Sequence, residues 1–92
     1  MRNAARTDAN QAEIVRALRA IGCQVYYIKL PVDLMVSGGP LRNRTMLLEV
    51  KLAGERLTGS QENFFSRWPG EWAVVHSPAE AVNIVCGKEL LA

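Results

Sequence analysis

Two apolar segments joined by a turn carry the charged residues that most restrict how this chain can fold. Residues 32–36 form an apolar run that contains Asp33, and residues 45–52 form a second run that contains Glu49 and Lys51. The Gly-Gly-Pro sequence between them predicts a turn, so we expect two neighbouring strands. Alternate strand residues face the same side, which places Glu49 and Lys51 together. Two acids beside a lysine favour a bound divalent metal, because unpaired buried charges are costly.

A structural interpretation fits the same residues. Apolar and charged residues alternate in many solvent-exposed edge strands, and Asp33 would also suit a turn or a strand end. Short motifs such as Glu-x-Lys often match by chance. The triplet alone therefore favours an ordinary amphipathic edge strand, and the surrounding sequence has to decide between the two interpretations.

Length and composition predict one small domain that covers residues 1–92. The chain has 92 residues, of which 49% are hydrophobic, enough for a core of modest stability. No apolar run approaches the length of a membrane span, and the first residues lack the apolar segment of a signal peptide. We therefore expect a cytoplasmic protein. Two isolated cysteines predict buried free thiols, and a single histidine leaves few ligands for zinc.

The charge balance permits nucleic-acid binding without requiring it. The net charge is +2, which is only mildly basic. Arg42 and Arg44 fall in the turn between the two charged strands, and Arg2 and Arg6 fall in residues 1–7, an expected flexible arm. These four arginines are the candidate contacts to DNA, although a solvated surface would look similar.

Periodicity and breakers predict an α/β chain. Helices are expected over residues 8–21, capped by Asp8 or Asn10, from a cap at Thr58 or Ser60 to about residue 68, and over residues 78–85 after a Ser77 cap. Strands are expected over residues 24–29, 32–36, 45–52 and 72–76. The first three strands can form an antiparallel meander, and a helical crossover predicts that the fourth lies parallel to the third. The result is a mixed sheet of about four strands flanked by helices, in the order α-β-β-β-α-β-α.

This order of elements and charges resembles the PD-(D/E)xK nucleases, and in particular the VRR-NUC group of small stand-alone nucleases often encoded by phages. The stretch Leu57–Gln61 resembles the segment that follows the catalytic strand in that group, whereas the group's proline before the first acid is Val32 here. The resemblance implies a restriction-endonuclease-like core. The matching positions, which span most of the chain, are Glu13, Asp33, Glu49, Lys51 and Gln61.

The resemblance also implies a reaction, the hydrolysis of DNA phosphodiester bonds with Mg²⁺ or Mn²⁺. Magnesium needs only one or two protein carboxylates besides waters and phosphate. Asp33, Glu49 and the backbone carbonyl of Val50 would hold the ion, and Glu13 would reach it through a water. The alternative for Glu13 is an ordinary surface acid or a partner of the helix dipole.

The remaining two matching residues would act on the water and the phosphate. Lys51 would place a positive charge beside the attacking water and the transition-state oxygens. Gln61 would orient the water or the lysine, or bind the DNA backbone, and an ordinary exposed amide is an equal alternative. The resemblance makes a homodimer acting on branched DNA such as a four-way junction plausible, in a bacterial or phage-infected cell.

Two further functions fit the sequence. A DNA-binding module of the same fold would bind without cleaving, and metal-dependent nicking of plasmid separates it from a nuclease. A small structural or interaction protein with an incidental Glu-Val-Lys strand would show no metal binding and would keep Asp33 exposed and far from Glu49.

Overall fold

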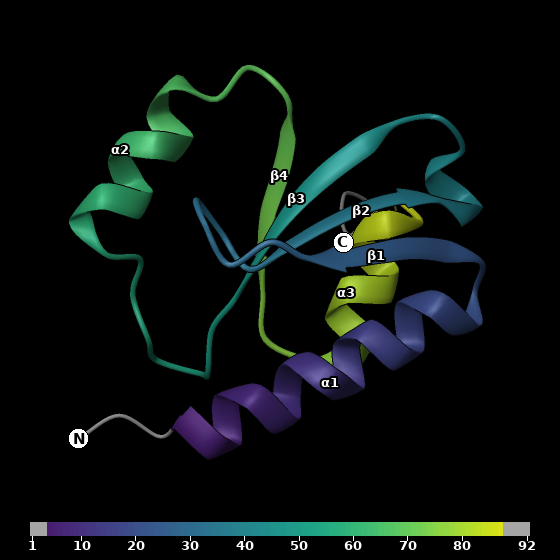
Figure 1. Ribbon diagram of the computed structural model, residues 1–92, viewed down its shortest axis with the longest axis horizontal. Helices are drawn as coiled ribbons and strands as arrows, with labels where there is room; N and C mark the ends of the chain where they lie inside the picture. The colour runs from purple at the N-terminus through teal and green to yellow at the C-terminus, as the bar shows by residue number, and fades with distance from the viewer. Residues whose placement is uncertain (1–3, 88–92) are drawn as a thin grey trace.

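A four-stranded sheet forms the centre of the structure, a computed structural model that describes residues 4–87 (Figure 1). The strands lie in the order β1 (Cys23–Tyr27), β2 (Leu34–Gly38), β3 (Thr45–Val50) and β4 (Glu71–Val75). Neighbouring strands β1, β2 and β3 pair antiparallel, and β4 pairs parallel to β3. The predicted meander and the parallel fourth strand are both confirmed.

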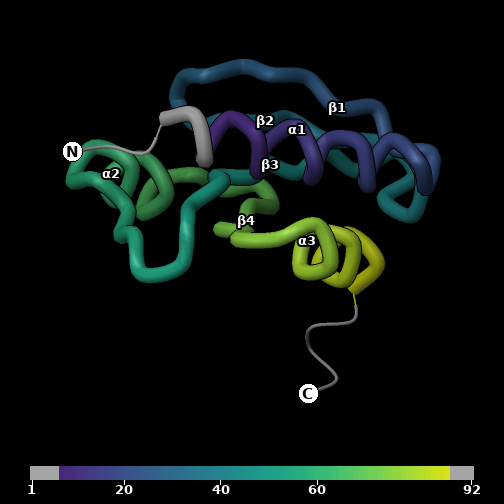
Figure 2. Tube along the Cα trace, turned by 90° about the horizontal axis from the view of Figure 1, so that it is seen from below, coloured from purple at the N-terminus to yellow at the C-terminus, as the bar shows by residue number. Residues whose placement is uncertain are grey.

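Helices cover both faces of this sheet. Helices α1 (Ala4–Ala20) and α3 (Pro78–Val85) pack on one face, and α2 (Gly59–Arg67) lies against the other, well apart from α3 (Figure 2). A short 3-10 helix (Gly39–Leu41) completes the β2–β3 connection. The predicted α/β class and the order α-β-β-β-α-β-α are therefore confirmed. Among residues 4–87, no helix has the length and apolar character needed to cross a membrane.

Helix α1 starts earlier than predicted. It begins at Ala4, so residues 4–7 are helical and do not form part of a flexible arm. Its first residues are Ala, Ala and Arg, which are strong helix formers, and this extends the helix past the expected caps. Asn10 is consequently an interior residue of α1, and its Nδ2 donates to the His76 carbonyl at 3.0 Å. That bond ties the helix to the residue that follows β4.

Strand β2 lies two residues later in the chain than predicted. It runs to Gly38, and Ser37 pairs with Gln24 on one side and Thr45 on the other. Asp33 therefore directly precedes the strand. Its carbonyl accepts hydrogen bonds from the Ile28 and Lys29 N–H groups, at 2.9 and 3.3 Å, which fix this entry into the sheet.

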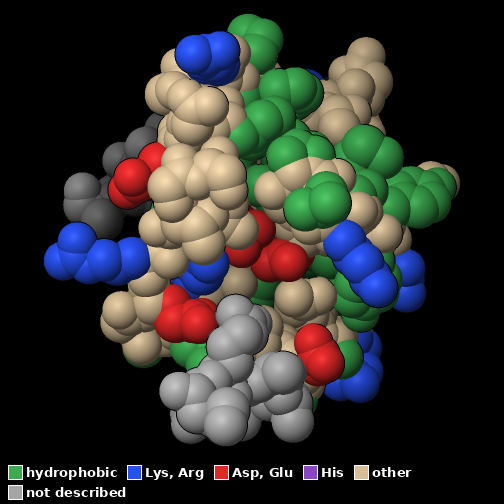
Figure 3. Space-filling model, turned by 60° about the vertical axis from the view of Figure 1, so that its left-hand side comes forward, with side chains coloured by type: hydrophobic (Ala, Val, Ile, Leu, Met, Phe, Trp, Pro, Cys, Tyr) green, Lys and Arg blue, Asp and Glu red, His purple; other side chains and the backbone are tan. Residues whose placement is uncertain are grey.

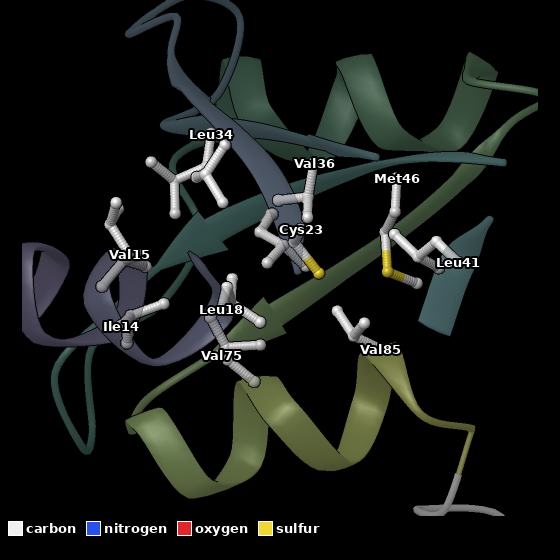
Figure 4. Close-up of a cluster of buried hydrophobic side chains, with 14 residues drawn as sticks. Ile14, Val15, Leu18, Cys23, Leu34, Val36, Leu41, Met46, Val75 and Val85 are labelled. Atoms are coloured by element: carbon white, nitrogen blue, oxygen red, sulfur yellow. The ribbon is translucent and has the colours of Figure 1, made fainter. Parts of the chain in front are cut away.

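The larger hydrophobic core lies between the sheet and the helices α1 and α3 (Figure 4). Side chains from α1, the four strands and α3 point into this space, and alternate residues of β3 take part. The buried residues are Ile14, Val15, Leu18, Cys23, Val25, Leu34, Val36, Leu41, Met46, Leu48, Val50, Val75, Ala81 and Val85. The prediction of a buried thiol is confirmed for Cys23 and wrong for Cys86, which is exposed at the end of α3.

Aromatic side chains anchor α2 on the opposite face. Phe65 stacks on Trp72 of β4 with ring centroids 3.9 Å apart, and Phe64 stacks on Trp68 at 5.4 Å. Phe65 also joins a smaller buried cluster with Val32 and Leu47. The helix begins at the predicted cap Thr58. These contacts hold α2 against the sheet.

Candidate active site

Two charged residues lie where β3 ends, on the face that α2 covers: Glu49 is within the strand and Lys51 directly follows it. Glu49 and Lys51 share this face with Leu47, because alternate strand residues point the same way, and their side chains are 5% and 9% exposed. Strand β3 lies between β2 and β4 and is not an edge strand. The interpretation of the triplet as a solvated edge strand is therefore wrong. Buried charges in an interior strand require specific partners.

The two predicted acids hold each other in place. The Asp33 N–H donates to Oε1 of Glu49 at 3.2 Å, and the Val50 N–H donates to Oδ2 of Asp33 at 2.8 Å. Each carboxylate thus accepts a backbone hydrogen bond from the segment that carries the other acid. These reciprocal bonds join residues 16 and 17 positions apart in the chain. A small structural or interaction protein would keep Asp33 far from Glu49, and the structure shows the two segments in direct contact.

Gln61 and Lys51 both contact Oε2 of Glu49. Gln61 Nε2 donates to Oε2 at 2.8 Å, and Lys51 Nζ lies 3.5 Å from the same oxygen. A capping box sets the amide orientation, because Gln61 Oε1 accepts from the Thr58 N–H at 3.0 Å while the Thr58 hydroxyl accepts from the Gln61 N–H at 3.2 Å. The amide oxygen is therefore engaged by the helix start, which leaves its NH₂ for Glu49. Gln61 is not an ordinary exposed amide.

The electrostatics of this cluster favour a cation. Burial raises the pKa of the Glu49 carboxyl above its ordinary value, and the charge of Asp33 raises it further. Lys51 and the hydrogen bonds from Gln61 and the Asp33 N–H lower this pKa, but the net shift is upward. The Lys51 ammonium contacts Glu49, and an added positive charge would further stabilise the ionised form of Glu49.

A polar cavity of about 210 Å³ opens onto these groups. Figure 3 shows acidic side chains in the middle of this side of the molecule, next to an area of hydrophobic side chains. Four acids and one lysine belong to the lining, so the cavity is negatively charged. The lining residues are Thr7, Asp8, Gln11, Asp33, Glu49, Val50, Lys51, Glu55, Thr58 and Gln61.

The donor set fits a hard cation that keeps part of its water shell. Within residues 4–87, no three acidic, histidine or cysteine side chains lie close enough together to enclose a metal by themselves. A site here would rest on Asp33 and Glu49, with backbone oxygen and water completing the shell, which is how magnesium usually binds. Zinc, which prefers histidine and cysteine, does not suit these ligands.

Helix α1 contributes to the cavity through residues other than the predicted one. Glu13 is exposed on α1 and does not line the cavity, which corrects its expected place as the helix-borne acid. Thr7, Asp8 and Gln11 line it instead. A helix turns about 100° per residue, so Glu13 points almost opposite to Gln11. The apolar stripe of α1 contains Leu18, and steps of three or four residues towards the N-terminus lead from it to Gln11 and Thr7. This periodicity in the sequence would have identified the side of α1 that lines the cavity.

The predicted DNA-binding arginines lie away from the cavity or outside the described side chains. Arg42 and Arg44 follow β2, at the opposite end of β3 from Glu49, a distance of about 13 Å along the strand at its usual rise. Arg44 Nε pairs with Glu71 Oε2 at 3.1 Å. Arg2 lies outside the described residues, and of Arg6 the structure describes the backbone, within α1. Their contact with DNA stays a prediction.

A structural comparison supports the resemblance that the sequence indicated. The fold is similar to that of a solved structure named "VRR_NUC domain", with a TM-score of 0.73 and 18% sequence identity, over 87% of this chain and 94% of that one. No family model matches the sequence, and no curated protein does. The likeness confirms the VRR-NUC type of fold, with its mixed sheet and flanking helices.

Proposed function

We propose that this protein is a metal-dependent endodeoxyribonuclease that hydrolyses DNA phosphodiester bonds in the cavity at the end of β3. The observation that carries the proposal is the carboxylate pair: Asp33 and Glu49 hold each other through backbone hydrogen bonds and face a polar cavity that Lys51 also lines. The likeness to a solved VRR_NUC domain supports the choice of a nuclease.

The ion would be held by the Asp33 and Glu49 carboxylates, with the Val50 carbonyl as a third protein ligand. A bound Mg²⁺ or Mn²⁺ would act as a Lewis acid on the phosphate and would increase the acidity of water beside it. Val50 also lines the cavity, and its N–H already fixes Asp33. The same short segment therefore supplies a ligand and orients another one.

Two side chains next to Glu49, those of Lys51 and Gln61, would have separate roles in the reaction. During hydrolysis a water oxygen bonds to phosphorus, a backbone P–O bond breaks, and negative charge builds on the phosphate oxygens. Lys51 carries a compact ammonium at the cavity wall, where it would stabilise this charge. Gln61 donates to Glu49, so its proposed role is to keep that carboxylate in position.

The substrate we propose is branched DNA of the four-way-junction type, cut by a homodimer. The described part of the chain measures 36 × 29 × 28 Å and has one carboxylate pair of the kind argued above. Cutting two strands in concert would need two such sites, which a two-fold dimer provides. Light scattering should give the mass of two chains at concentrations where paired incisions occur, and a monomer under those conditions would contradict this part.

Plasmid nicking with Mg²⁺ or Mn²⁺ tests the central proposal. Wild-type protein should nick supercoiled DNA, EDTA should stop the reaction, and Asp33→Asn should reduce the rate by more than about a hundredfold. Glu62→Gln, which removes an exposed acid of α2 outside the cavity lining, is the matched control and should nick normally. DNA binding without any metal-dependent nicking would instead identify a non-cleaving module.

A panel of substrates then defines the specificity. The same preparation should be assayed on four-way junction, flap, duplex and single-stranded DNA with either metal ion. Preference for the junction supports the proposed substrate. Equal rates on plain duplex would leave the nuclease proposal standing and remove its branched-DNA part.

A further inference from the structure

Thr7 is the buried residue that the proposed reaction leaves unexplained. It lies in α1, and 6% of its surface is exposed. Its Oγ1 is buried and has no hydrogen-bond partner among residues 4–87. A buried hydroxyl without a partner is unfavourable, and almost all such groups in proteins find one. A valine of the same shape would fill this position without that penalty.

The hydroxyl belongs to the wall of the charged cavity. Thr7 and Gln11 are one helical turn apart on the same side of α1, and both line the cavity that also contains Asp33 and Glu49. Neither of these α1 residues carries a charge. They share the α1 side of the cavity with one acid, Asp8, and the other three acids of the lining come from outside this helix. A hydroxyl without a partner in the described part of the chain therefore belongs to a residue of the cavity wall.

We propose that Thr7 is a positioning residue whose hydroxyl holds a water of the hydration shell of the divalent cation at Asp33 and Glu49. This inference rests on the proposed function. Magnesium keeps several waters when two carboxylates hold it, and such waters need hydrogen-bond partners. A threonine hydroxyl both donates and accepts, so it suits a water better than a second acid would. Residues of this kind typically change metal affinity by about 10–100-fold.

The test compares Thr7→Val with Thr7→Ser and measures stability and metal binding separately. Without metal, Thr7→Val should melt at the same temperature as wild type or higher, because it removes an unpaired hydroxyl. Its affinity for Mn²⁺, measured by calorimetry, should fall by about tenfold or more. Thr7→Ser keeps the hydroxyl and should keep wild-type affinity. Thr7→Ala serves as a second variant without the hydroxyl if valine disturbs the helix.

A matched control and three outcomes decide the question. Thr45→Val removes an exposed hydroxyl at the other end of β3 and should leave Mn²⁺ affinity unchanged. Wild-type affinity in Thr7→Val or Thr7→Ala, or an equal loss in Thr7→Ser, overturns the inference and leaves the nuclease proposal intact. If wild type itself binds no Mn²⁺, or if Asp33→Asn binds it as tightly as wild type, the metal site and the inference both fail.

Discussion

The two faces of the sheet differ in what they bury. On the face covered by α1 and α3, every strand contributes aliphatic or sulfur-containing side chains to one continuous core. On the face covered by α2, Glu49 of β3 and Lys51 just after it are buried next to a small cluster that contains Leu47. Trp68 and Trp72, which help to hold α2, remain partly exposed. One face is closed by packing, and the other stays open around a charged cavity.

Along β3, residues on one face therefore contribute mainly to stability, and residues on the other face belong to the candidate active site. The apolar face gains free energy from burial, at about 25 cal/mol for each Å² removed from water. The charged face loses free energy, because Glu49 is buried beside another acid and its pKa is raised. Aromatic stacking of α2 on β4 offsets part of that loss. We therefore expect substitutions at neighbouring residues of β3 to have opposite consequences.

The largest expected effect on stability lies on the apolar face. Leu48→Ala should lower the free energy of unfolding by about 2–5 kcal/mol, because a fully buried side chain leaves a cavity behind. Urea denaturation measures this loss. Molecules that remain folded should keep a cleavage rate near that of wild type. A loss below about 1 kcal/mol would show that this face is not the main source of stability.

The largest expected effect on activity lies three residues further along. Lys51→Ala should reduce cleavage by about 10²–10³-fold, because the charge facing the phosphate is lost. Calorimetry should still detect Mn²⁺ binding, since lysine is not a ligand. Lys51→Arg should restore activity only in part, because the planar guanidinium is wider than the ammonium. Joint loss of metal binding and activity in Lys51→Ala would contradict the assigned role.

Substitutions of the N-cap residues of α2 and α3, which lie on opposite faces of the sheet, should have smaller effects on stability. Thr58 caps α2 and Ser77 caps α3, each through a side-chain oxygen that accepts a backbone N–H. Replacing either by alanine should cost about 0.5–2 kcal/mol of stability. Only Thr58→Ala should also reduce cleavage, by roughly tenfold, since fraying of α2 would move Gln61 away from Glu49. Equal cleavage rates in the two variants would contradict this link between the helix start and the site.

The smallest expected effect concerns pH and Glu49. Because the folded-state pKa of Glu49 is raised, its ionisation destabilises the metal-free protein. The protonated form of Glu49 therefore favours the folded state. Its contribution to stability is fully present below the ordinary glutamate pKa and is lost as pH rises through the folded-state pKa. Glu49→Gln lacks this loss, so melting in EDTA from pH 4 to 8 should show its stability gaining on wild type as pH rises. A gain of about 1 kcal/mol appears as roughly 4–8 °C, and a constant difference would contradict the assignment.

Much of the fold followed from local sequence signals. Thr58 and Ser77 begin their helices as predicted, because capping depends on neighbouring backbone groups alone. Because alternate strand residues point to the same face, the sequence correctly predicted that Glu49 and Lys51 lie on one side of the sheet. The start of α1 and the bounds of β2 were misplaced, since Ala4 extends a helix without any cap signal and the pairing of Ser37 depends on a strand elsewhere in the chain.

The sequence by itself determined the class of fold, because caps, turns and strand periodicity are local signals. Its resemblance to the VRR-NUC group placed Asp33, Glu49, Lys51 and Gln61 in one candidate group. Only the tertiary structure decided that β3 is an interior strand, that Gln61 donates to Glu49, and that α1 lines the cavity with Thr7 and Gln11 where Glu13 was expected. The physical reason is that these contacts join residues 12 or more positions apart. Their geometry depends on how the helices pack and rotate against the sheet, which local periodicity does not specify.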